Sequence, residues 1–344
     1  MKHILVNSCH GNAPAIIGTS IAQEIAANYR SVGEAVQIVV PHIYGREKRI
    51  LLEEGLYTPD VVLDDHIGAL HRQVLFEGDF NAQMRKLLAS RDAVEQQFRS
   101  YLKQTYPLFE LELNIGSFFT SEAPAVLAYP CAYTELYERT LKTPDLAGKY
   151  DRSLLEQLLE KMHEVDSRMM FEYIPTYNPF SFDDERKPRA KEIETPPLRK
   201  IPSQVYERMP KRVVYCMLPG TGVERDVILQ RARMDRELGF TIYVPPWVTD
   251  TEFKKRKPLK TIPHQNVQLV LSRAGWGTIY LCQVTGKELM HVDFTADEPE
   301  VYFNVKTLNR KDMREATRKQ LHTFGTVDGI SFVAQDIMKR FLSR

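Results

Sequence analysis

The alternation of short apolar runs with amphipathic stretches constrains the fold of this chain more than any other feature. Residues 4–6 and 36–40 are apolar runs of strand length, and residues 17–29 between them have a helical pattern. A strand, a helix and a second strand in so short a span form the βαβ unit of a parallel sheet. The alternation continues with predicted strands at 109–113 and 125–129 and predicted helices at 80–102 and 153–165. The first half of the chain is therefore predicted to be a layered α/β domain.

A second block of the same kind follows a proline-rich stretch. Proline occurs seven times between residues 175 and 211. Because proline lacks a backbone donor and ends helices, we expect a linker at 181–211. Beyond it, strands are predicted at 212–217, 240–244 and 267–271, and a helix at 227–238.

The two blocks together predict an α/β chain with two Rossmann-like, doubly wound domains that face a central cleft. In such sheets ligands bind at the carboxyl ends of the strands. We expect an N-terminal domain at 1–180, a C-terminal domain at 212–325, and a helix at 326–344 that packs back on the first domain.

Composition excludes several classes of protein. Hydrophobic residues make up 43% of the chain and charged residues 26%, which is typical of a globular protein and not of a disordered one. The net charge of +1 gives no overall attraction to nucleic acid. The four cysteines are scattered without zinc-ligand spacing, and the apolar run at the N-terminus ends at Asn7, too early for a signal peptide. We therefore expect a cytoplasmic protein without a structural zinc site.

The segment with the most chemical information lies at the end of the strand predicted at 267–271. Arg273 follows this strand, and the turn Gly275-Trp276-Gly277-Thr278 leads into a helix expected from Ile279 onward. Glycine allows a ligand close to the backbone, a helix N-terminus offers free N–H groups, and arginine adds a fork of donors, so this pattern predicts an anion site. The alternative is an ordinary turn whose glycines only satisfy positive φ.

A second small-residue turn has the same setting. Gly220, Thr221 and Gly222 follow the strand predicted at 212–217 and precede the next helix. Backbone N–H groups in such a turn also suit a phosphate group. Taken alone, this turn is as consistent with an ordinary reversal of the chain as with a phosphate site.

Taken together, these turns resemble the donor-binding domain of glycosyltransferases with the GT-B fold, in particular the peptidoglycan-type N-acetylglucosaminyltransferases and the UDP-glycosyltransferases. Arg273-Ala274-Gly275, with Thr278 behind it, is similar to the family's Arg-Ala-Gly phosphate loop, and Gly275-Trp276-Gly277-Thr278 to its Gly-Trp-x-Ser/Thr step. Asp297 and Glu298 lie near the place of its Asp/Glu-Gln pair, and Tyr302-Phe303-Asn304-Val305 is similar to the helix start that follows. The likeness covers about residues 212–310.

This resemblance implies a glycosyltransferase that moves a sugar from a nucleoside diphosphate sugar, with UDP as the expected nucleotide, to an unknown acceptor. It implies an inverting reaction without a metal ion and no cofactor beyond the donor substrate. The two turns would bind the diphosphate, and Asp297 and Glu298 the sugar hydroxyls. The family's ribose-binding glutamate is replaced by Leu281, so another residue must contact the ribose; Gln283 is a candidate.

Two residues of the first half are candidates for the base that deprotonates the acceptor. His10 follows the first strand, and the unperturbed pKa of a histidine side chain lies near neutrality, which suits a general base. The alternative is a histidine that only hydrogen-bonds within its loop. Glu122, just before the strand predicted at 125–129, is the second candidate.

Two charged clusters have weaker interpretations. Lys254-Lys255-Arg256-Lys257, with Lys260, could contact an anionic membrane surface, although a hydrated loop is the simpler explanation. Asp64-Asp65-His66 could suggest a metal site, but consecutive residues point in different directions. Two alternative functions stay open: a sugar-nucleotide 2-epimerase of the same fold, and a non-catalytic sugar-nucleotide-binding partner subunit.

Overall fold

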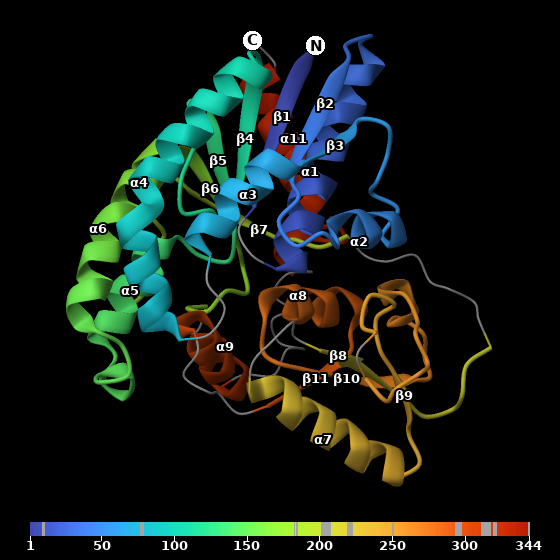
Figure 1. Cartoon of the computed structure of the whole chain (residues 1–344). Coiled ribbons are helices and arrows are strands. Elements are labelled where there is room, and N and C mark those ends of the chain that lie inside the picture. The colour runs from blue at the N-terminus through green and yellow to red at the C-terminus, as the bar shows by residue number, and fades with distance from the viewer. Residues whose placement is uncertain are drawn as a thin grey trace. The chain divides into compact units, whose positions relative to one another are not determined.

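The computed structural model describes residues 1–8, 11–75, 79–181, 183, 185–200, 208–218, 223–249, 251–292, 298–310, 318 and 322–342. The chain forms two compact units (Figure 1). Unit 1 comprises Met1–Asn178, Asp183–Leu198 and Val327–Arg344, and unit 2 comprises Pro179–Phe182 and Arg199–Thr326. The C-terminal segment therefore belongs to unit 1. The stretch 181–211, expected to be a linker, is instead divided between the units and contributes a strand to unit 1.

The core of unit 1 is a parallel sheet of seven strands in the order β3-β2-β1-β4-β5-β6-β7. The strands are β1 (Lys2–Ser8), β2 (Val36–Pro41), β3 (Val61–Asp64), β4 (Phe109–Ile115), β5 (Ala125–Ala128), β6 (Met169–Pro175) and β7 (Glu192–Thr195). The chain builds outward from β1 to β3 and then returns to place β4 on the other side of β1. The strand order thus reverses between β1 and β4, where doubly wound sheets form a ligand crevice at the carboxyl ends.

Helices cover both faces of this sheet. They are α1 (Asn12–Ser31), α2 (Glu47–Glu53), α3 (Asp65–Val74), α4 (Phe80–Thr105), α5 (Tyr133–Lys142), α6 (Arg152–Arg168) and α11 (Gly329–Ile337), with short turns η1 (Pro144–Leu146) and η3 (Met338–Leu342). α11 packs on α1, while α4 packs on α3 and α6 on the other face (Figure 1). α1 approaches β1 and β4 so closely that a Cβ atom at Gly18 would lie 2.4 Å from Val6 Cγ1. The apolar stripe predicted on the long helix is buried in α4, as at Met84, Leu87 and Phe98.

Unit 2 has a parallel sheet of four strands in the order β11-β10-β8-β9. The strands are β8 (Val213–Met217), β9 (Thr241–Tyr243), β10 (Val267–Ser272) and β11 (Glu288–His291), and the helices are α7 (Val223–Glu237), α8 (Trp276–Thr285), α9 (Pro299–Arg310) and the turn η2 (Leu259–Thr261). Side chains alternate across β8: Val213 and Tyr215 join the core on one face, Val214 and Cys216 the core on the other. Here the strand order reverses between β8 and β10.

No helix in the described ranges is both long enough and apolar enough to cross a membrane. The three cysteines that the structure describes, Cys131, Cys216 and Cys282, are buried free thiols.

Candidate functional site

The carboxyl-terminal ends of β8 and β10 lie side by side in unit 2. Met217 at the end of β8 is in register with Ser272 at the end of β10. The segments that leave these strands therefore begin as neighbours, at the place where the strand order reverses. Arg273 lies on one of these segments. The glycine turn 220–222 lies on the other, outside the described residues.

Helix α8 directs its N-terminus to this same edge. The helix begins at Trp276 rather than at the expected Ile279. Gly277 disfavours a helical turn, but burial of the Trp276 side chain stabilises it. Gly275 is the N-cap, and no side chain within the described ranges caps the helix. The Gly275 N–H donates to the Arg273 carbonyl over 2.8 Å and the Thr278 N–H to the Gly275 carbonyl over 3.0 Å. The Trp276 and Gly277 amides between them are the first amides of the helix, which have no acceptor inside it, and the helix dipole makes this end positive. The N-terminus of α8 is therefore suited to an anion.

Gly275 has neither a conformational nor a packing reason to be glycine. Its φ is −87° and its ψ is 146°, which is extended backbone that any residue adopts. A Cβ atom built at Gly275 would meet nothing within 4 Å. The alternative explanation by positive φ therefore does not apply to Gly275. The missing side chain leaves the backbone open to close approach from outside.

Arg273 and Glu298 meet at the same edge. The Arg273 guanidinium donates a hydrogen bond to a carboxylate oxygen of Glu298 over 2.7 Å, and the two side chains are 24% and 29% exposed. Both residues were predicted as parts of one donor site, and the structure brings them together across 25 positions of sequence. Asp297, predicted beside Glu298, lies outside the described residues.

Helix α9 holds the turn between β10 and α8 in place. Asn304 is 1% exposed, and its side-chain amide donates to the Ala274 carbonyl over 2.7 Å. Ala274 packs against Val301 and Val305 of the same helix. In the sequence, Asn304 stands out only through the resemblance of Tyr302-Phe303-Asn304-Val305 to a helix start. An asparagine on the apolar side of a helix, three residues after Val301, is the pattern that would have marked it.

The corresponding edge of unit 1 is built on a buried polar cluster. The Asn7 side-chain amide donates to Glu112 over 2.7 Å and to the Phe119 carbonyl over 2.8 Å. The Ser121 N–H donates to the second Glu112 oxygen over 2.6 Å, and burial raises the pKa of this carboxyl. These bonds fix the loop after β4 beside the end of β1. His10, predicted to follow β1 as the base, lies outside the described residues.

Comparison with known proteins settles the architecture. No family model matches the chain, and no curated protein matches it by sequence. Solved structures match over nearly the whole chain. The glycotransferase of kitacinnamycin is 13% identical, with 98% of this chain and 99% of that chain covered and a TM-score of 0.59. The Streptomyces sp. SF2575 glycosyltransferase SsfS6, complexed with thymidine diphosphate, is 14% identical, with 98% and 99% covered and a TM-score of 0.56. Phytolacca americana UGT2, complexed with UDP-2-fluoroglucose and pterostilbene, is 12% identical, with 99% of both chains covered and a TM-score of 0.54. This chain has the GT-B fold.

Leu281 of α8 lies inside unit 2 rather than at its surface. It is 1% exposed and packs in the core of unit 2 with Tyr215, Tyr243 and Leu259. Leu281, which the sequence resemblance places where a glutamate would bind the ribose, is therefore a core residue. Gln283 lies two residues further along α8, about 200° around the helix axis from Leu281, so it does not share that face. Gln283 is 1% exposed, and its side-chain oxygen and nitrogen have no hydrogen-bond partner among the described residues. Its contact with the ribose stays a prediction.

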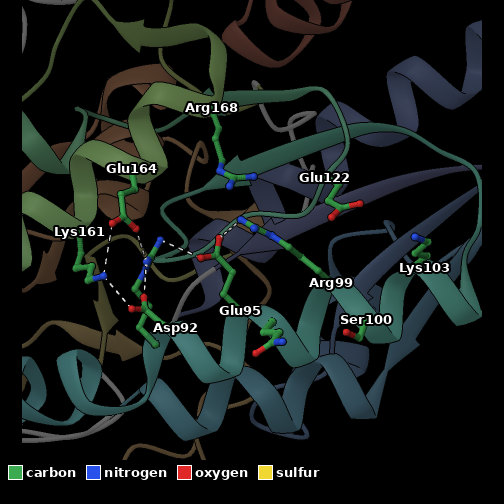
Figure 2. Close-up of a pocket in the computed structure, with 11 residues that line it drawn as sticks. Asp92, Glu95, Arg99, Ser100, Lys103, Glu122, Lys161, Glu164 and Arg168 are labelled. Atoms are coloured by element: carbon green, nitrogen blue, oxygen red, sulfur yellow. Dashed lines mark hydrogen bonds and ion pairs between the residues drawn. The ribbon is translucent and has the colours of Figure 1, made fainter.

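Glu122 lies away from the edge at which a GT-B sheet binds ligands. It precedes β5 by three residues, at the amino-terminal end of that strand, and its side chain lines a cavity between α4 and α6 (Figure 2). The structure does not bring Glu122 to the carboxyl ends of β1 and β4. The assignment of a base therefore depends on His10 and stays a prediction.

The acidic run at the start of α3 has structural partners. Asp64 caps α3 through the Ile67 N–H at 2.8 Å and accepts a hydrogen bond from the Tyr106 hydroxyl over 2.7 Å. Asp65 contacts His42 Nδ1 over 2.7 Å. Throughout the described part of the chain, no three His, Cys, Asp or Glu side chains are grouped as a metal site requires.

The basic run predicted to contact membranes lies in the long segment between β9 and β10. Lys254, Lys255 and Lys260 are exposed. Arg256 is partly buried, and its guanidinium donates to the Val248 carbonyl over 2.8 Å. The three exposed lysines give this GT-B chain a local cluster of positive charge on unit 2.

Proposed function

We propose that this chain is a glycosyltransferase that moves a sugar from a nucleoside diphosphate sugar to an acceptor hydroxyl. One observation carries the proposal: Arg273, the open backbone of Gly275 and the N-terminus of α8 meet at the reversal of strand order in unit 2. This arrangement offers a cation, the Trp276 and Gly277 amides of the first helical turn and room for close approach, which are the requirements of a diphosphate site.

The chemistry of the proposal rests on the departing diphosphate. Negative charge grows on it as the bond to the sugar breaks, and donors fixed in advance stabilise that charge. The Arg273 fork and the α8 amides supply such donors without a metal ion. In this structure the Arg273 guanidinium is hydrogen-bonded to the Glu298 carboxylate. A diphosphate would compete for the guanidinium and leave Glu298 to accept a hydrogen bond from a sugar hydroxyl.

The nature of the donor is inferred from the structural neighbours. SsfS6 was solved with thymidine diphosphate, and Phytolacca americana UGT2 with UDP-2-fluoroglucose and pterostilbene. We assign a UDP- or TDP-sugar as donor and a hydroxylated small molecule as acceptor. His10 is assigned as the base and inversion as the outcome. Asn7 and Glu112 support this assignment indirectly, because they fix the end of the strand that leads to His10.

We also propose that the chain contacts anionic membrane surfaces through Lys254, Lys255 and Lys260. Each exposed lysine near such a surface contributes about 1 kcal/mol of attraction. The contact is peripheral, since the cluster consists of charge without an exposed apolar anchor beside it in the described segment.

A ligand panel tests the catalytic proposal. Thermal unfolding is measured with UDP, TDP and GDP, and with their sugars, in wild type and in Arg273→Ala, with EDTA present. We expect UDP or TDP to raise the unfolding temperature of wild type only, since a ligand at a hundredfold excess over Kd stabilises by about 2.7 kcal/mol. Slow release of free nucleoside diphosphate from one sugar donor supports the transferase.

The other outcomes favour the alternatives. Absence of any response to nucleotides contradicts the proposal and favours a partner subunit. Binding without release of diphosphate favours a non-catalytic sensor. Conversion of the donor sugar to its 2-epimer, with the nucleotide still attached, favours an epimerase.

A further inference from the structure

The last part of the connection from β6 to β7 is a segment that forms no helix, residues 185–191. We call this segment the strap. It consists of Glu185, Arg186, Lys187, Pro188, Arg189, Ala190 and Lys191. None of the seven residues is buried, and none has a large apolar side chain other than proline. The hydrophobic effect, which is proportional to the apolar area removed from water, therefore does little to hold the strap on unit 1.

Hydrogen bonds from charged side chains hold the strap instead. The Arg186 guanidinium donates to Glu135 of α5 over 2.9 Å and to Glu192 of β7 over 2.8 Å. The Lys191 ammonium donates to the Met169 carbonyl at the start of β6 over 2.7 Å. The strap is thus attached to a helix and to two strands by polar contacts.

A second arginine of the strap lies on a buried carboxyl group. Arg189 Nε is 3.1 Å from Glu172 Oε2, outside hydrogen-bond geometry, and Arg189 also contacts Asp166 of α6 over 3.3 Å. Glu172 is 1% exposed and Asp166 is 6% exposed, whereas the Arg189 side chain is 31% exposed. A buried carboxylate costs free energy unless hydrogen bonds and a well-placed cation compensate it.

The surroundings of Glu172 compensate its negative charge poorly. The charged groups that face it come from the strap, α6 and β7: Arg189, Lys191, Asp166 and Glu192. Its register neighbour on β5 is Leu127, and α5 contributes the Thr134 hydroxyl, which is hydrogen-bonded to Arg189 and to Asp166. Since Arg186 pairs with Glu192, two buried acids share the single guanidinium of Arg189.

This crowding couples a proton on Glu172 to the position of the strap. Burial raises the pKa of the Glu172 carboxyl from 4.5 to about 7; Arg189 opposes this shift, and the Asp166 charge adds to it. Removal of the strap would let water reach the carboxyl and return its pKa towards 4.5. Between these two values the closed state holds a proton that the open state releases, so opening becomes more favourable as the pH rises.

We propose that the strap is a proton-sensitive device, which lies closed on unit 1 while Glu172 is neutral and opens when Glu172 is ionised. Its position gives the opening a consequence. The chain returns to unit 1 at Asp183, two residues before the strap, after Pro179–Phe182 of unit 2. In unit 2 the Thr307 hydroxyl of α9 donates to the Pro179 carbonyl over 2.7 Å. The strap therefore controls the length of free chain between a segment held in unit 2 and strand β7 of unit 1.

Hydrogen exchange of a peptide that covers residues 185–191 tests the proposal. Exchange is measured in wild type and in Glu172→Gln at pH 6 and at pH 8, and comparison of the two proteins at the same pH cancels the intrinsic pH dependence of exchange. Glutamine has the shape of the neutral acid and does not titrate. We expect exchange of the strap in wild type, relative to the variant, to increase about tenfold from pH 6 to pH 8.

Glu138→Gln is the matched control on α5. Glu138 is exposed and lies 3.8 Å from Lys142, so its replacement should leave the pH dependence of the strap as in wild type. Arg189→Gln removes the shared cation but keeps the acid, and the strap should then exchange faster than in wild type at both pH values. Peptides from α4 report global unfolding of unit 1.

Three results would overturn the proposal. Wild type and Glu172→Gln could show the same change between pH 6 and pH 8, so that Glu172 does not control the strap. Arg189→Gln could leave exchange of the strap unchanged. The strap could also exchange only as fast as α4 in wild type, which would mean that it opens only when unit 1 unfolds.

Discussion

Arg273 and Glu298 are held together by a 2.7 Å hydrogen bond between guanidinium and carboxylate, at the carboxyl-terminal edge of the sheet in unit 2. Because both side chains are about one-quarter exposed, such a pair stabilises by no more than about 1 kcal/mol. A ligand with two phosphate groups can therefore displace the carboxylate. The pair keeps Arg273 oriented at the edge while leaving it available for exchange.

Glu298→Gln should consequently tighten the binding of a nucleoside diphosphate. The neutral amide no longer competes for Arg273 and no longer repels the phosphates, so we expect a gain of about two- to fivefold in affinity for UDP or TDP. Arg273→Ala should weaken the same binding about tenfold or more. Calorimetry on both single variants and the double variant measures the coupling. If Glu298→Gln has the same effect with and without Arg273, the two residues do not act on one ligand.

Gly275→Ala should separate ligand binding from stability. A methyl group at Gly275 meets open space and the backbone there is extended, so the free energy of unfolding should change little. The same methyl group would obstruct a phosphate that approaches the backbone, and affinity for the diphosphate should fall.

Gly286→Ala is the control at the opposite end of α8. Gly286 ends the helix with φ +64°, where alanine costs about 1 kcal/mol or more. We therefore expect lower stability with unchanged nucleotide affinity. Equal loss of affinity in both variants would show that the effect is structural.

Asn304→Ala should weaken both unit 2 and its ligand site. The substitution removes the buried 2.7 Å bond to the Ala274 carbonyl and leaves that oxygen unsatisfied, at a cost of about 1–3 kcal/mol. The turn that carries Arg273 would loosen with it. Asn309→Ala on the same helix removes only an exposed contact with His291. This control should change neither the free energy of unfolding nor the affinity for a nucleoside diphosphate. Thermal unfolding measures the stability of both variants, and calorimetry measures their nucleotide affinity. If Asn304→Ala keeps the stability and the affinity of wild type, Asn304 does not anchor the turn.

Local pattern was sufficient to predict most of the strands and the position of Arg273, but not where neighbouring elements meet. β8 and β10 are apolar runs and were predicted as strands. Their adjacency depends on hydrogen bonds between residues more than 50 positions apart, which no periodicity encodes. The Arg273–Glu298 pair has the same long-range origin. The site could therefore be predicted as two separate turns, and only the fold joins them.

Two differences between the predicted and observed elements have tertiary explanations. β7 lies between Pro188 and Pro196, and proline is tolerated beside an edge strand because an edge needs fewer backbone donors. The early start of α8 reflects burial of Trp276, which outweighs the low helix propensity of Gly277. In both cases tertiary packing outweighs a residue, proline or glycine, that usually interrupts regular structure.

His71 should make unit 1 less stable in acid. Burial lowers the pKa of His71 to about 3 from 6.5, and the ring lies against Phe98 and Phe119. Below pH 6.5 the unfolded chain gains a proton on His71 that the folded chain does not accept, so stability falls as the pH falls toward 3. The slope is at most about 1.4 kcal/mol per pH unit.

His71→Leu should remove this part of the slope. Denaturant unfolding of wild type and variant is measured at about pH 7.5 and about pH 5. We expect the free energy of unfolding of the variant, relative to that of wild type, to be about 2 kcal/mol higher at the lower pH than at the higher one. An identical pH dependence of the two proteins would show that His71 is protonated in the folded state.

Replacement of Lys254, Lys255 and Lys260 by alanine should reduce binding to anionic vesicles. Each lysine contributes about 1 kcal/mol near a phosphatidylserine surface, so the triple variant should bind about a hundredfold more weakly at low salt. Sedimentation with vesicles of phosphatidylcholine, with and without phosphatidylserine, measures this. A control variant in which exposed Lys142, Lys149 and Lys339 are replaced loses the same charge from scattered positions. If the control variant loses as much binding as the cluster variant, overall charge explains the attraction. If wild type binds vesicles with and without phosphatidylserine equally, the proposed membrane contact is contradicted.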